Sequence, residues 1–140
     1  MTKERVALVQ QSFFKVLPIS DLAAQLFYKR LFEMDPSARP MFKGSMEEQG
    51  RKLMQMIGMA VTGLSNPGEI MGLVADLGRR HVEYGVSDAQ YDTVGSALIW
   101  TLAQGLGPDF TPDVEAAWVE AYEFIAKLMK DAASQNKPIS

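Results

Sequence analysis

The chain has 140 residues, of which 47% are hydrophobic, a formal net charge of −3 and no cysteine. This length fits one domain with a proper core, and the lack of cysteine excludes thiol catalysis, thiolate metal sites and disulfides. No apolar run approaches the ~20 residues of a membrane span, and the scattered basic residues do not indicate a nucleic-acid partner. The start, Met1-Thr2-Lys3-Glu4-Arg5, has no apolar core of a signal peptide, so we expect a soluble, cytoplasmic protein.

The first half of the chain predicts three long helices and a short one. Helix starts are marked by residues that cap N-termini, namely Thr2, Ser20 or Asp21, Asp35, and Ser45 with Glu48 as a capping box. Pro18 ends the first helix, and the second continues to about Met34. Asp35-Pro36 opens the short third helix, which Pro40 limits, and the fourth reaches Leu64.

The second half predicts three more long helices. Ser65-Asn66-Pro67-Gly68 breaks the chain before the first, and Gly85 is placed to end it in the left-handed conformation. Ser87 or Asp88 starts the next, and Thr111-Pro112 starts the last. With no strand-like alternation, the expected fold is all-α, with six long helices and one short one in a single domain over residues 1–133. We expect the polar tail, residues 134–140, to fray.

The helix that ends near Gly85 contains the only histidine, His81. On a 3.6-residue repeat this histidine continues the apolar stripe formed by Ile70, Leu73, Val74 and Leu77. The imidazole therefore points where the apolar side chains point. Position alone leaves two interpretations open, a satisfied core histidine or a ligand or catalytic group.

All-helical chains of this size form either bundles or globin-type sandwiches. This sequence resembles the bacterial single-domain haemoglobins of the Vitreoscilla haemoglobin and Hell's Gate globin type, which are related to the globin domain of flavohaemoglobins. The resemblance follows family order over nearly the whole chain. Its matching stretches are Phe27–Phe32, Arg39–Lys43, Gln49–Met54, Arg80–Val86 and Leu98–Leu102.

The resemblance implies a globin fold around a pocket for one b-type haem. It makes His81 the proximal iron ligand, with the backbone carbonyl of Leu77 accepting from its second ring nitrogen. Tyr91 matches a tyrosine beside that ligand, although a core tyrosine is the alternative. With one histidine in the chain, two imidazoles cannot hold the iron. The ferrous state should be five-coordinate unless Tyr28, Gln49 or a methionine occupies the sixth position.

On the distal side the resemblance assigns Tyr28, Gln49 and Leu53 to the gas ligand. A phenol and a carboxamide can both donate hydrogen bonds without carrying charge, and oxygen on ferrous iron develops negative charge. Phe42 matches the phenylalanine that wedges the porphyrin. Tyr28, Gln49 and Phe42 otherwise read as core or boundary residues. The other expected cofactor contacts, of which the polar ones could equally be solvated, are Lys52, Arg80, Tyr84, Val86 and Val94.

Two positions depart from the family pattern. The glutamate of its proximal hydrogen-bond relay falls on Ala133, and Gly50 follows Gln49 where proline is common. The first departure puts a charge relay in doubt, and the second indicates a different start of that helix.

The resemblance implies reversible binding of oxygen, carbon monoxide and nitric oxide, for oxygen storage, delivery or buffering. The alternatives are nitric oxide dioxygenation with a separate reductase, a gas sensor, or a haem-free regulatory domain. We expect the sequence to contain no flavin or nicotinamide site. The expected assembly is a monomer or weak homodimer.

Overall fold

The computed structural model describes residues 1–42, 44–83 and 87–135, leaving aside the side chains of 41, 67, 69, 79–83, 88 and 132–135. Within these ranges all regular structure is helical and there is no strand, as the sequence predicts. The long helices are α1 Lys3–Val16, α2 Ser20–Met34, α3 Met46–Gly63, α4 Pro67–Glu83, α5 Asp88–Leu106 and α6 Pro112–Gln135; the 3₁₀ helices are η1 Leu17–Ile19, η2 Pro36–Met41 and η3 Gly107–Asp109.

The six long helices match the predicted number, and η2 corresponds to the predicted short helix. The turns η1 and η3 were not predicted. Both contain a proline in their first turn, which is favourable there because proline has no backbone N–H to satisfy. Helix α6 extends to Gln135, beyond the start of the predicted tail. Residues 136–140 and the predicted stop at Gly85 lie outside the described ranges.

Local capping explains where most helices begin. The predicted caps Thr2, Asp35, Ser45 and Thr111 each accept a hydrogen bond from a backbone N–H in the first turn. Ser87 forms a full capping box with Gln90. The predicted cap at Ser20 or Asp21 was wrong. Because η1 leads directly into α2, Ser20 already has helical angles (φ −58°, ψ −39°), and Ile19 precedes the helix without a side-chain cap.

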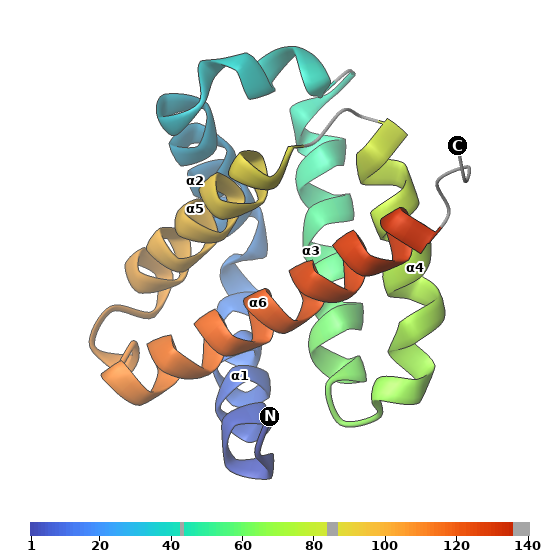
Figure 1. Cartoon of the computed structure of the whole chain (residues 1–140). Helices are drawn as coiled ribbons and strands as arrows, with labels where there is room; N and C mark the ends of the chain where they lie inside the picture. Colours follow the sequence, from blue (N-terminus) through green and yellow to red (C-terminus); the bar gives the residue numbers. More distant parts are fainter. Residues whose placement is uncertain (43, 84–86, 136–140) are drawn as a thin grey trace.

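Helix α6 crosses the molecule and packs on α1 and α4, while α2 packs on α3 and α5 (Figure 1). The largest core cluster lies where α1 and α6 meet, and it includes Val9, Phe13, Ala117 and Trp118. A buried polar link joins the two helices within this cluster, because the Trp118 indole N–H donates to the Ser12 hydroxyl at 2.7 Å. No helix in the described ranges is long and apolar enough to cross a bilayer.

Helix α4 approaches α6 so closely that backbone meets backbone. A Cβ atom at Gly78 would lie 2.3 Å from the Met129 carbonyl oxygen. Real Cβ atoms do not come this close to backbone, so any side chain at position 78 would push the two helices apart. Glycine at this position therefore sets the spacing of the crossing.

We expect Gly78→Ala to lower the free energy of unfolding by about 1–3 kcal/mol, because an added methyl group overpacks the crossing. Gly72→Ala is the matched control on the same helix, since a Cβ atom there meets nothing within 4 Å. That control should be neutral or gain about 0.5–1 kcal/mol from helix propensity. Urea denaturation measures both, and equal stability of the two variants would contradict the close crossing.

Candidate functional site

Four of the residues that the sequence assigned to the site share one apolar cluster. Tyr28 comes from α2, Phe42 follows η2, Leu53 comes from α3 and Val94 from α5, and all four pack around a core that includes Phe27, Leu31, Ala38 and Ala97. These segments are distant in sequence, so the fold alone brings the side chains together. We call this group the Tyr28 cluster.

The aromatic rings of the Tyr28 cluster contact one another both edge to face and stacked. The Tyr28 ring lies 5.2 Å from the Phe42 ring at an interplanar angle of 70°, and the Phe32 ring stacks on it with ring centres 5.9 Å apart. Phe32 also contacts Phe42, with ring centres 5.7 Å apart. Sequence reasoning did not assign Phe32 to the site. Its signal was available, because a residue four positions after Tyr28 lies on the same helix face.

The Tyr28 hydroxyl is buried and only weakly engaged. It donates to the Gln49 backbone carbonyl at 3.3 Å, which is longer than the usual ~2.5–3.0 Å for a hydroxyl donor. Burial raises the pKa of Tyr28 to about 12, because desolvation disfavours the phenolate. The phenol is therefore neutral and keeps its proton at physiological pH.

The second group of site residues lies on the α4 side. Leu77 packs at the edge of a cluster that includes Ile70, Val74, Tyr91 and Met129, which we call the Tyr91 cluster. His81 follows Leu77 by about one helical turn on α4. The side chains of Arg80 and His81, and residues Tyr84 and Val86 altogether, lie outside the described part.

The apolar side chains assigned to cofactor contact are incompletely covered. Phe42, Leu53, Leu77 and Val94 are all half-buried, whereas Val74 in the nearby core is almost fully buried. Apolar surface of this kind, present in both clusters, suits a flat apolar group that would cover it. Lys52 is exposed, and Gln49 is half-buried on α3.

Helix α6 holds Tyr91 from two directions. The Tyr122 hydroxyl donates to the Tyr91 backbone carbonyl at 2.6 Å, and the Lys130 ammonium lies 4.9 Å from the Tyr91 ring centre. Burial, together with Tyr91 and Asp92, raises the pKa of Tyr122 above its ordinary value. Sequence reasoning assigned neither Tyr122 nor Lys130 to the site, since no local pattern predicts which residue of α6 meets α5.

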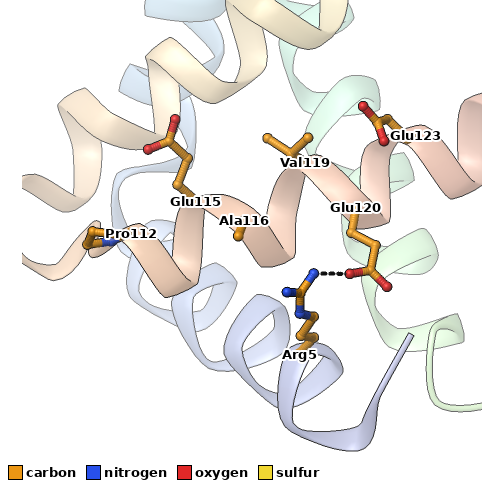
Figure 2. Close-up of a pocket in the computed structure, with 7 residues that line it drawn as sticks. All are labelled: Arg5, Pro112, Glu115, Ala116, Val119, Glu120 and Glu123. Carbon is orange, nitrogen blue, oxygen red and sulfur yellow. Dashed lines mark hydrogen bonds and ion pairs between the residues drawn. The ribbon is translucent and has the colours of Figure 1, made fainter.

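Two open cavities lie along α6. One, of about 500 Å³, faces α1 and is lined by Arg5 with three glutamates, of which Glu120 pairs with Arg5 (Figure 2). It contains none of the predicted site residues. The other, of about 690 Å³ between α5 and α6, includes Tyr91, Trp100, Tyr122 and Lys130 in its lining. Across the described side chains, no group of three His, Cys, Asp or Glu residues could hold a metal ion by itself.

Comparison with known proteins identifies relatives over most of the chain. Residues 25–129 match the family model for globins. A flavohemoprotein from Xylella fastidiosa is 33% identical over 110 residues, 76% of this chain, and one from Rhizobium meliloti is 29% identical over 115 residues, 79% of this chain. The chain spans only 28% of the length of each of these two relatives.

Two solved structures share the fold over nearly their full lengths. A bacterial globin from Campylobacter jejuni superposes with a TM-score of 0.83 at 27% identity, covering 96% of this chain and 97% of that chain. An engineered carbene transferase from Rhodothermus marinus, a proposed nitric oxide dioxygenase, superposes with a TM-score of 0.86 at 27% identity. The match covers 96% of this chain and 94% of that chain. These likenesses confirm the predicted all-α globin fold.

The raised pKa of Tyr28 predicts how stability changes in alkali. Between the ordinary pKa of about 10 and the folded value of about 12, the folded chain keeps a proton that the unfolded chain releases. The contribution of Tyr28 is complete below pH ~10 and is lost as pH rises to ~12, at up to about 1.4 kcal/mol per pH unit.

Urea unfolding from pH 9 to 12 should therefore show a shallower loss of stability for Tyr28→Phe than for the unaltered chain. Phe32→Leu alters the ring stacked on Tyr28 without removing an ionisable group. It should lower stability about equally at every pH. An unchanged slope for Tyr28→Phe would contradict the raised pKa.

Proposed function

The chain belongs to the globin family, and from that premise we propose that it binds one b-type haem through His81 and uses it to bind oxygen and other diatomic gases reversibly. Haem held by His81 would supply a ferrous iron that can bind a diatomic gas. The observation that carries the proposal is the convergence of Tyr28, Phe42 and Leu53 in one cluster from three separate segments.

The uncovered apolar surface supports the fit of a haem. Phe42, Leu53 and Val94 on one side and Leu77 on the other are half-buried, and a porphyrin between the Tyr28 and Tyr91 clusters would cover them. His81 is the only imidazole in the sequence, and neutral imidazole is the usual axial ligand of oxygen-binding haem proteins. Propionate contacts from Lys52, Arg80 and Tyr84, a contact from Val86, and the Leu77 carbonyl as acceptor for His81 stay predictions.

The state of the Tyr28 hydroxyl supports a role for this residue as a hydrogen-bond donor to the bound gas. Its phenol is neutral at physiological pH, and burial raises its pKa further, to about 12. Its present hydrogen bond to the Gln49 carbonyl is long, at 3.3 Å, so little free energy is lost when the proton turns to another acceptor. A neutral donor in a dry pocket stabilises a gas ligand that develops negative charge without repelling an approaching molecule.

Visible absorption spectroscopy tests haem binding. We expect the reduced protein to show a strong band near the blue end of the visible range that shifts sharply when carbon monoxide is added. His81→Ala should weaken or alter this band, and added imidazole should restore part of it by occupying the vacated position. Absence of haem uptake after addition of haemin would overturn the proposal, and a His81→Ala spectrum equal to the original would overturn the assignment of the ligand.

The rate of oxygen release tests Tyr28. A net hydrogen bond of about 1.4 kcal/mol corresponds to about a tenfold change in equilibrium, so Tyr28→Phe should release oxygen about ten times faster in stopped-flow measurements. Carbon monoxide develops little charge and is the internal control, because its release should change far less. Unchanged oxygen release would remove Tyr28 from this role and direct attention to the Gln49 side chain.

Nitric oxide dioxygenation is the second candidate. It is favoured by the likeness to the Rhodothermus marinus protein and by the flavohemoprotein relatives. This reaction joins one oxygen molecule with one nitric oxide to give nitrate, and the iron that is oxidised must be reduced again by a reductase. Repeated consumption of nitric oxide with a reductase, faster than by a control globin, would favour it over gas storage. A cytoplasmic location and the monomer or weak homodimer stay predictions.

A further inference from the structure

Tyr91 is the aromatic residue that joins α5 to the packed faces of α4 and α6. Its side chain is 7% exposed, and it shares its cluster with Ile70 and Val74 from α4 and with Ala126 and Met129 from α6. Leu77, one turn before His81, packs against the same cluster. Tyr91 therefore packs in the same cluster as Leu77, the residue about one turn before His81 on α4.

Two contacts with α6 fix Tyr91 in place. Tyr122 donates to its backbone carbonyl at 2.6 Å, and this approach is open because residue 95 is glycine. A Cβ atom at Gly95 would come within 2.6 Å of the Tyr122 ring. The backbone of Tyr91 is thus tied to α6 independently of its ring.

The second contact places the positive charge of Lys130 over the Tyr91 ring. Its ammonium lies 4.9 Å from the ring centre, within the ~6 Å over which a cation is attracted to an aromatic face. The Lys130 side chain is half-buried, and partial burial reduces the screening of its charge by solvent. Tyr91 therefore carries a cation on its face.

Other charges near this contact do not have the same geometry. The cavity between α5 and α6 is also lined by Asp92, Glu123, Lys127 and Asp131, all of which are exposed. Lys127 lies on the same helix and in the same cavity as Lys130. Among the described side chains, however, Lys127 makes no cation–ring contact. The cation–ring contacts there join Arg30 to Trp100, Arg39 to Phe32 and Lys130 to Tyr91.

We propose that Lys130 is a positioning residue that holds a positive charge on the Tyr91 ring and thereby raises the reduction potential of the iron ligated by His81. This inference rests on the proposed function. A fixed positive charge disfavours ferric iron more than ferrous iron, because the ferric state carries one more positive charge.

Spectroelectrochemical titration of the haem-loaded protein tests the role of Lys130. Lys130→Met removes the charge while keeping an unbranched apolar chain, and we expect the reduction equilibrium to move toward ferric iron by up to about tenfold, which is about 59 mV for one electron. Lys127→Met removes the same charge from the same cavity and should change the equilibrium less than about twofold at such an exposed site. Lys130→Arg should restore the original potential.

Two results of the titration would overturn the proposal. One is an unchanged potential in Lys130→Met. The other is an equal change in Lys130→Met and Lys127→Met, which would reduce the effect to net charge.

A second measurement tests the contact without haem. In NMR spectra of the purified 140-residue chain, the Tyr91 ring current should displace the chemical shift of the Lys130 ε-methylene protons upfield. Tyr91→Leu should abolish this displacement. Tyr122→Phe should retain it. No displacement in the unaltered chain would overturn the inference whether or not haem binds. Failure of every variant to take up haem, with the displacement present, would instead overturn the proposed function and the role of Lys130 that depends on it.

Discussion

The close crossing of α4 and α6 determines the geometry of the Tyr91 side of the molecule. Gly78 permits the approach, because any Cβ atom there would collide with the Met129 carbonyl. Gly78 lies within one turn of His81 on α4, and Met129 directly precedes Lys130 on α6. The same crossing therefore fixes the backbone positions from which the proposed ligand and the cation leave their helices. A wider crossing would displace both together.

The opposite side depends on a second close approach. A Cβ atom at Gly50 would lie 2.9 Å from the Ala24 Cβ atom, so α2 and α3 meet through small residues. Gly50 follows Gln49, whose carbonyl accepts from Tyr28. Gly50, a departure from the family pattern, thus lies at a helix contact that sets how Tyr28 meets α3. The aromatic rings of Phe32 and Phe42 then complete the surroundings of the phenol.

Local chemistry explains what the sequence could predict. Caps such as Thr2 and Ser45 act within one helical turn, so their residue types suffice to locate a helix start. The resemblance to globins is confirmed by the globin family match. Tyr28, Phe42 and Leu53, which the resemblance assigned to contact with the gas or the porphyrin, share one cluster. Their roles toward a haem remain predictions. Ser20 failed as a cap because the preceding 3₁₀ turn was not anticipated, and that turn made its backbone helical.

Contacts between distant helices were not predictable in the same way. Lys130 belongs to a run that mixes charged and apolar residues, and its sequence neighbours do not show that it meets Tyr91. The contact requires α5 and α6 to pack at a particular distance, which Gly95 permits by admitting the Tyr122 ring. Lys127 and Lys130 have the same residue type and lie one turn apart on α6. Only the three-dimensional structure separates the exposed cation from the one on the ring.

If the proposed function holds, the Tyr28 side and the Tyr91 side of the site would both favour binding of the gas to ferrous iron, by different means. A neutral phenol on the Tyr28 side favours a gas that draws negative charge, and it adds no net charge to the pocket. A cation on the Tyr91 side favours ferrous iron, which is the form that binds oxygen reversibly. A carboxylate relay would instead favour the ferric form. If the proposal for Lys130 holds, the charge on the Tyr91 ring would favour gas binding over oxidative chemistry, and nitric oxide dioxygenation would depend on how fast the oxidised iron is reduced.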